Sequence, residues 1–331
     1  MKQPAADGGR RLSGLGRPSG RDAVAGFVTG LFSIPEGVAY ASIGGFAAPL
    51  GLWSGVVPTI LGSVFARTVL MVTTLTSAIA LSASSVLQAA GLSTGDLGAI
   101  ATLTVLVGVV MLILGLLKLG SVMSYVSTAV MTGFTVGIAL QIIAGVAKDA
   151  TGYTPTSSNT IGKLVDALVH IGRWQLPVVL VAAATVGSWL LFRLFKPTRT
   201  LATLLALLVV TAVTVLLGTK IERVSDIAAI PRSLPPFTLP DFAAIPALAT
   251  GAVAIALVAL AQAAGISSAV ANPDGSKTDA STDFSAQGAA NLAGGLFGAL
   301  PTGGSLSRTG IAQSSGANSR WRASSPVSRL P

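Results

Sequence analysis

The sequence contains no cysteine and a single histidine, His170, so it offers no disulfide, no thiolate site and no His-based metal centre. Charged residues make up only 10% of the 331 residues, whereas typical soluble domains have about 25%. Apolar residues make up 51%. Because a soluble helix needs one polar face, this composition excludes an ordinary soluble core. The sequence therefore predicts an all-α polytopic membrane protein.

About ten apolar stretches follow one another, most of them close to the roughly 20 residues that span about 30 Å of hydrocarbon. They lie at 22–44, 49–66, 74–92, 97–117, 121–147, 174–195, 200–218, 245–271, 284–300 and 304–318. The third and tenth are the shortest and least apolar, and each begins with hydroxyl residues. Between the fifth and sixth, the pattern predicts an amphipathic surface helix from Thr160 to His170.

Basic residues gather in alternate loops, which predicts a cytoplasmic N-terminus in the cell membrane by the positive-inside rule. The inner loops then hold the basic tail, Arg67, Lys118, 193–199, Lys277 and 320–329. We interpret residues 1–21 as a disordered cytoplasmic tail. The net charge of +9 is explained by these loops, and nucleic acid is not expected as a partner. The third and tenth stretches cross in opposite directions.

Four places put polar side chains where hydrocarbon disfavours them. They are Pro35, Glu36 and Tyr40 in the first stretch, Thr73, Thr74, Thr76 and Ser77 at the third, Gln262 in the eighth, and Pro301–Gly316 at the tenth. A buried arginine such as Arg308 costs about 2.5–3.5 kcal/mol on insertion scales, which favours a function. A lone serine or threonine can instead bond its own i−4 carbonyl. Four such places in one chain are better explained by a site.

A helix that begins inside the membrane leaves up to four backbone N–H groups without partners. An anion satisfies them and gains at most about 2 kcal/mol from each helix dipole. The charge of Arg308 would then offset the lost hydration of the anion. Secondary transporters build midplane sites in this way from broken helices in inverted repeats. The third and tenth stretches are therefore predicted to be half-helices around an anion site.

No catalytic or cofactor motif is found, so we expect neither an enzyme nor a cofactor. Residues 275–278 lack the spacing of a P-loop, and no GxSxG or HExxH occurs. The loop with Asp274, Asp279 and Asp283 does not match a calcium loop, and we interpret it as a solvated turn.

Five stretches resemble the SulP family of inorganic-anion transporters. They are IPEGVAYA at 34–41, GFAAPLGLWSGVVPTILGSVFA at 45–66, TLTSAIA at 74–80, GFTVGIALQI at 133–142 and QGAANLAGGLFGALPTGGSLSRTG at 287–310. The last is the most specific, and the resemblance extends from about Asp22 to Trp321.

The resemblance implies the seven-plus-seven inverted-repeat fold of uracil permease, with a core domain (spans 1–4 and 8–11) that moves against a gate domain (spans 5–7 and 12–14). It places the anion between half-helices 3 and 10, with help from spans 1 and 8. Carried over, the site residues are Glu36, Tyr40, Thr76, Ser77, Gln262, Gly304, Ser305, Leu306, Ser307 and Arg308. The implied substrates are sulfate, bicarbonate, chloride or dicarboxylates, and the implied partners are membrane lipid and a second copy in a homodimer.

Two departures from the family pattern bear on the site. The usual glutamine of span 1 is Glu36 here, and the usual acid of span 8 is Gln262. We hypothesise that the carboxylate coupling transport to protons has moved to Glu36. The alternative, given equal weight, is that Glu36 only neutralises Arg308. The family's Gly-Pro before Thr76 is replaced by Thr74-Leu75.

A third departure is that the chain ends in polar residues 321–331, where the family continues into further spans and a cytoplasmic STAS domain. We expect a C-terminal truncation, with a transporter domain at 22–320, core spans 1–4 and 8–10, and gate spans 5–7. The leading interpretation is secondary transport of a small inorganic anion. The alternatives are a nucleobase permease of the same fold, whose site would want carboxylates on spans 8 and 10, and a fragment that does not transport.

Overall fold

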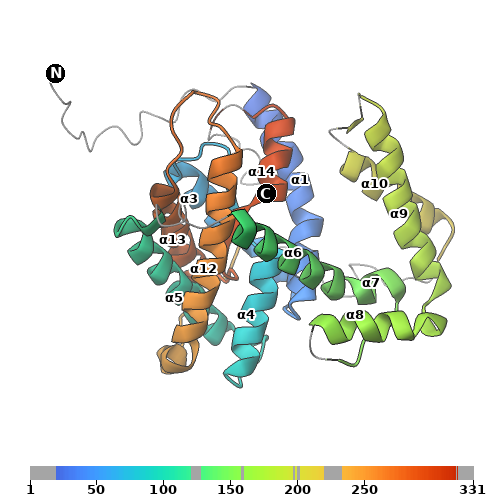
Figure 1. The fold of residues 1–331 in the computed structure, drawn as a ribbon, viewed down its shortest axis with the longest axis horizontal. Coiled ribbons are helices and arrows are strands. Elements are labelled where there is room, and N and C mark those ends of the chain that lie inside the picture. The colour runs from blue at the N-terminus through green and yellow to red at the C-terminus, as the bar shows by residue number, and fades with distance from the viewer. Residues whose placement is uncertain are drawn as a thin grey trace. The chain divides into compact units, whose positions relative to one another are not determined.

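The computed structural model describes residues 20–120, 128–157, 160–196, 198–199, 202–219, 233–317 and 319 (Figure 1). The predictions for the tail before residue 20, for 121–127 and for 320–331 fall outside these residues. The chain forms two compact units, one of Met1–Tyr125 with Pro231–Pro331 and one of Val126–Ile230.

Unit 1 is formed by both ends of the described chain. Its elements are α1 (Gly20–Ile43), α2 (Ala48–Trp53), α3 (Val57–Phe65), β1 (Val72–Thr74), α4 (Ser77–Ala89), α5 (Leu97–Leu116), a 3₁₀ turn (Phe242–Ala244), α12 (Ile245–Ala269), α13 (Ala280–Leu296), β2 (Gly303–Ser305) and α14 (Leu306–Ser314). These agree with the predicted stretches within a few residues. The difference is at 49–66, where two short helices replace one, because Pro58 lies in the first turn of α3, where a proline is favoured at a helix start.

Five segments of the described chain are long and apolar enough to cross a membrane. They are Asp22–Ile43, Ala48–Phe65, Leu97–Leu116, Leu176–Leu194 and Phe242–Ala269. Helices α4 and α10 are apolar but shorter. The protein is therefore a multi-pass membrane protein built from full-length and short helices.

Helices α5 and α13 approach closely because glycines face each other between them. A Cβ added at Gly108 would lie 2.7 Å from the backbone nitrogen of Leu292. One added at Gly288 would lie 2.6 Å from the backbone nitrogen of Leu112. In lipid, such small residues permit the close backbone packing that holds helices together.

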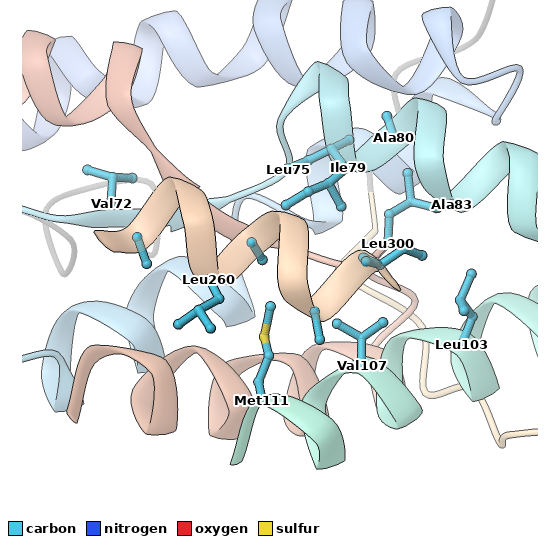
Figure 2. Close-up of a cluster of buried hydrophobic side chains, with 14 of the residues drawn as sticks. Val72, Leu75, Ile79, Ala80, Ala83, Leu103, Val107, Met111, Leu260 and Leu300 are labelled. Atoms are coloured by element: carbon cyan, nitrogen blue, oxygen red, sulfur yellow. The ribbon is translucent and has the colours of Figure 1, made fainter. Parts of the chain in front are cut away.

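The core of unit 1 lies where α4, α5 and α12 meet, as Figure 2 shows. Ile79 of α4, Leu103 and Met111 of α5 and the loop residue Leu300 are fully buried. This apolar cluster includes Val72 of β1 and Ile79 of α4, so it joins the strand and the helix that follows it to the core.

Unit 2 comprises α6 (Thr128–Gly145), α7 (Ala147–Thr151), α8 (Thr160–Val169), a 3₁₀ turn (Ile171–Arg173), α9 (Leu176–Leu194) and α10 (Ala202–Leu216). Helix α8 lies where the amphipathic surface helix is predicted, and Ile161, Val165 and Leu168 expose more than half of their surface. His170 follows it, with Nδ1 2.9 Å from a carboxylate oxygen of Asp166.

Candidate functional site

Two three-residue strands form the centre of the candidate site. β1 and β2 pair antiparallel, with Val72 opposite Ser305 and Thr74 opposite Gly303. α14 follows directly after β2, and α4 begins three residues after β1. The predicted half-helices therefore both begin at one small ribbon, although they are more than 200 residues apart in the sequence.

Hydroxyl side chains cap the first turns of both half-helices. The Thr76 hydroxyl accepts a hydrogen bond from the backbone N–H of Ile79 at 3.4 Å. The Ser305 hydroxyl accepts one from the backbone N–H of Arg308, also at 3.4 Å. A serine or threonine at this position satisfies one of the donors that a helix start leaves open. Both bonds are long, so the capping is weak.

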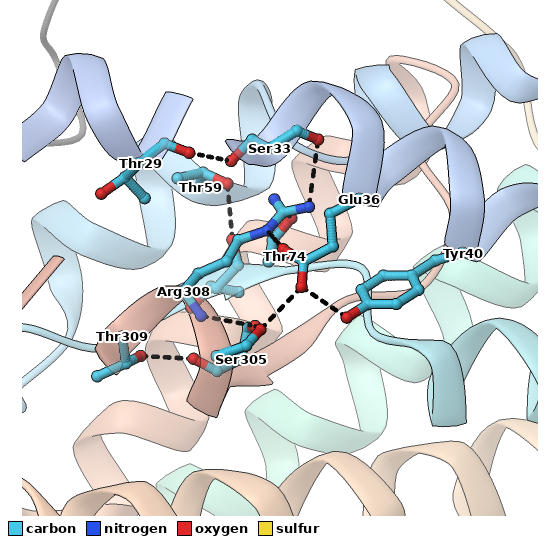
Figure 3. A network of polar contacts seen from close by, with 11 residues as sticks. Thr29, Ser33, Glu36, Tyr40, Thr59, Thr74, Ser305, Arg308 and Thr309 are labelled. Carbon is cyan, nitrogen blue, oxygen red and sulfur yellow. Dashed lines mark hydrogen bonds and ion pairs between the residues drawn. The ribbon is translucent and has the colours of Figure 1, made fainter. Parts of the chain in front are cut away.

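Arg308 is the largest fully buried side chain of the described residues, with 1% of its surface exposed. Its guanidinium donates from Nε to Glu36 at 2.7 Å and from Nη1 to the Thr74 hydroxyl at 2.7 Å. Nη2 donates to the Ser33 carbonyl oxygen at 3.3 Å. A buried arginine needs such partners, because an unpaired charge without water is strongly disfavoured. The cation is therefore fixed at the start of α14 by three contacts (Figure 3).

Glu36 is held by three donors within one face of the site. Besides Arg308, the Tyr40 hydroxyl donates to Oε1 at 2.6 Å and the Ser307 hydroxyl donates to Oε1 at 2.9 Å. Glu36 and Tyr40 are four residues apart, which puts them on the same side of α1. The sequence predicts Glu36 as a possible counter-charge of Arg308, and the structure places the two in an ion pair.

The other predicted residues lie around this pair in different roles. The Thr76 hydroxyl is 3.3 Å from Oε1 of Gln262, so Gln262 is linked to the start of α4. Ser77, the first residue of α4, is buried. A Cβ added at Gly304 would lie 2.9 Å from a methyl carbon of Ile266, which explains the glycine. Leu306 exposes 63% of its surface and lies outside the polar network.

Two features of the site are not predicted from the sequence. The first is Thr74, which the sequence marks only as a polar residue in an apolar stretch, although its hydroxyl accepts a hydrogen bond from Arg308. The break between α2 and α3 also borders the site, since a Cβ added at Gly55 would lie 3.8 Å from Nη1 of Arg308. The proline at 58 was the available signal for this break.

A stripe of polar side chains on α13 binds the two segments that lead into β1 and β2. Asp283, Gln287 and Asn291 recur every four residues, so they share one face of the helix, and all three are fully buried. The backbone N–H of Thr302 donates to Oδ1 of Asn291 at 2.7 Å, and Nδ2 of Asn291 donates to the Thr302 carbonyl at 2.9 Å. This pair of bonds fixes the chain just before β2.

The other end of the stripe fixes the chain before β1. Asp283 accepts from the backbone N–H of Thr68 at 2.7 Å, from that of Arg67, and from the Thr68 hydroxyl. Nε2 of Gln287 lies 3.1 Å from the sulfur of Met71. The interpretation of Asp283 as part of a solvated turn is therefore wrong, because a buried carboxylate here replaces the hydrogen bonds that water would make.

The site contains one cation, one carboxylate, several hydroxyls and two helix starts. Within the described part of the chain, no group of three or more His, Cys, Asp or Glu residues could hold a metal ion. This arrangement can bind a small polar or charged ligand.

Comparisons with known proteins agree with this arrangement. The model of the sulfate permease family matches residues 20–322. Sulfate transporter 4.1, chloroplastic, of Arabidopsis thaliana is 28% identical over 302 residues, covering 88% of this chain and 44% of its own length. Solute carrier family 26 member 6 of Homo sapiens is 27% identical over 327 residues, covering 90% of this chain and 43% of its own length. The chain thus spans less than half the length of these two relatives.

A solved structure shares the fold. The transmembrane domain of a cyanobacterium bicarbonate transporter, BicA, superimposes with a TM-score of 0.75 at 24% identity, covering 95% of this chain and 80% of that one. The described elements therefore share the fold of that transmembrane domain.

Proposed function

The chain belongs to the sulfate permease family, and from this premise we propose that it binds a small inorganic anion at the start of α14 and carries it across a membrane. One observation carries the proposal: Arg308 is buried at the start of a half-helix, beside the hydroxyls of Ser305 and Ser307. The proposed activity is transport, and no enzymatic step is invoked.

The electrostatics of the site favour a negative ligand. Two helix starts supply partial positive charge, at most about 2 kcal/mol each. Arg308 supplies a formal positive charge once an anion replaces its partner Glu36, in a region of low dielectric. A nucleobase site of this fold would want carboxylates on spans 8 and 10 to bond the base. This chain has Gln262 and Arg308 at those places, so an anion fits better than a nucleobase.

The proposed substrates are sulfate or bicarbonate, with chloride and dicarboxylates as further members of the class. The plant relative is named as a sulfate transporter and the structural neighbour as a bicarbonate transporter. Both anions are small oxyanions that accept several hydrogen bonds. Serine hydroxyls and backbone N–H groups can donate hydrogen bonds to either one, so we propose a site for small anions of this kind.

The two compact units support a division into moving parts. We assign unit 1, which carries the site, as the core domain, and unit 2 as the part of the gate domain contained in this chain. Movement of the core against the gate would expose the anion alternately on each side of the membrane. The protein is proposed to lie in the cell membrane, surrounded by lipid, with its N-terminus in the cytoplasm and a second copy as partner.

Transport is further proposed to be coupled to protons through Glu36. When the site is empty, Glu36 pairs with Arg308 at 2.7 Å. A proton taken up by Glu36 together with the anion would keep the charge of the site balanced during movement. Uptake by the wild-type protein should therefore rise as the external pH falls, and uptake by Glu36→Gln should lose this dependence.

Reconstitution into liposomes tests the proposal. Purified 331-residue protein should bind and take up labelled sulfate or bicarbonate in a saturable manner. Ser307→Ala should weaken both, and Ser314→Ala, a hydroxyl deletion at the other end of the same helix, should not. Binding without uptake would support the alternative of a fragment that does not transport. Uptake of labelled uracil with no anion binding would refute the anion site.

A further inference from the structure

We propose that Glu36 is an internal competitor of the substrate, a tethered carboxylate that occupies the position of the anion and must be displaced when an anion binds. This inference rests on the proposed function and deepens it. It assigns to one side chain the control of affinity and of selectivity between anions of different charge.

The contacts of Glu36 are those expected of a bound anion. Its two carboxylate oxygens accept from a hydroxyl of α14, Ser307, from a phenol of α1, Tyr40, and from the guanidinium of Arg308, at 2.9, 2.6 and 2.7 Å. Charge-assisted bonds of this length are the strong kind. The donors of Ser307, Tyr40 and Arg308 are thus already bound to the Glu36 carboxylate (Figure 3).

Exposure shows which partner an arriving anion meets first. The Arg308 side chain is 1% exposed, whereas the Glu36 side chain is 21% exposed. Arg308 also donates to Thr74 and Ser33, so its guanidinium is turned into the protein. An anion cannot approach the cation closely without moving the carboxylate.

The charge of Glu36 has a specific consequence for selectivity. When an anion displaces Glu36 from Arg308, the carboxylate stays tethered to α1 beside it, and until it takes up a proton it carries a charge of the same sign as the anion. Repulsion from this charge is twice as large for a divalent anion as for a monovalent one at the same distance, since Coulomb energy scales with the product of charges. Glu36 should therefore weaken sulfate binding more than chloride binding.

The test measures dissociation constants of sulfate and chloride by isothermal titration calorimetry, with the protein in lipid nanodiscs. Glu36→Gln keeps the size and the acceptor oxygen but removes the charge. It should tighten sulfate binding at least tenfold and raise the ratio of sulfate to chloride affinity. Asp96→Asn is the matched control, because it removes one negative charge at the cap of α5, where asparagine caps equally well. It should change neither constant.

A second variant keeps the inference testable if Glu36→Gln fails to fold, as judged by size-exclusion chromatography. Glu36→Asp keeps the charge but withdraws it by one methylene from Ser307 and Arg308, so sulfate should bind more tightly than to wild type. Equal or weaker sulfate binding by the folded variants, or an unchanged anion ratio, overturns the inference and leaves the anion site in place. No binding of either anion by wild type or variants overturns the proposed function itself.

Discussion

Replacing Asn291 by alanine should destabilise the protein and the site together. The change removes the acceptor of the Thr302 N–H at 2.7 Å and the donor to the Thr302 carbonyl at 2.9 Å. Thr302 is fully buried, so both backbone groups would lose a partner without gaining water. Each buried unsatisfied group costs about 1–3 kcal/mol, which gives an expected loss of about 2–6 kcal/mol. The strand β2 begins at the next residue, so anion binding should weaken as well.

The free energy of unfolding can be measured by titrating the protein in mixed micelles with sodium dodecyl sulfate and following helix content by circular dichroism. Gln313→Ala is the matched control, since it removes an amide from an exposed position of α14, and it should stay within about 0.5 kcal/mol of wild type. A loss below about 1 kcal/mol for Asn291→Ala, with unchanged anion affinity, would show that the stripe on α13 does not anchor β2.

Three further changes test separate contacts. Thr74→Val removes the acceptor 2.7 Å from Nη1 of Arg308, and it should lower the free energy of unfolding by about 1–3 kcal/mol in the same titration. Gly51→Ala places a Cβ 2.0 Å from a backbone oxygen of α1, so it should lower the thermal midpoint by several degrees. The pKa of Asp166 lies below its usual 3.8, chiefly because the Thr156 N–H donates to it. The protection of the Thr156 amide, measured as its hydrogen-exchange rate relative to the intrinsic rate at the same pH, should therefore fall as pH drops through this lowered pKa.

Each change has a matched control. Thr74→Ser keeps the hydroxyl and should behave as wild type, and equal losses for both variants would contradict the role of the hydroxyl. Gly133→Ala meets no atom within 4 Å and should not lower the midpoint; a similar fall there would mean that the clash at Gly51 is not the cause. Asp166 contributes stability above its unfolded pKa and loses it as pH falls through the lower folded value, so Asp166→Asn should abolish the acid dependence.

The helices of this protein could be read from the sequence because the bilayer imposes a length and a composition on them. Leu97–Leu116 and Ile245–Ala269 were predicted within a few residues, since a run of about 20 apolar residues has one stable arrangement in hydrocarbon. The same constraint made Glu36 and Arg308 conspicuous, because a charge in an apolar stretch is costly and needs a reason.

The ribbon between the half-helices could not be predicted in the same way. β1 and β2 have three residues each, too few to show a period-2 pattern, and their pairing joins positions more than 200 residues apart. The role of Thr74 depends on that pairing, because its partner Arg308 follows β2. Asp283 was misinterpreted for a similar reason: its backbone partners at 67 and 68 are close only in the folded chain.

The edges of this ribbon explain why the surrounding polar residues are needed. A two-stranded ribbon leaves one edge of each strand without a neighbour, and in a membrane protein water does not supply the missing bonds. The Thr59 hydroxyl donates to the Thr73 carbonyl at 2.8 Å, and the Thr309 hydroxyl accepts from the Val72 N–H at 3.1 Å. Side chains of α3 and α14 thus form hydrogen bonds with backbone groups of β1.

The stripe on α13 likewise supplies hydrogen-bond partners to the backbone of the segments that lead into the strands. Asp283 takes the backbone donors before β1, and Asn291 takes both backbone groups of the residue before β2. One helix therefore sets where both half-helices begin. Because the positions of Ser305 and Arg308 follow from that start, the geometry of the proposed anion site depends on α13 side chains that lie outside it. A change on α13 should alter affinity through position alone, whereas a change at Glu36 should alter it through charge.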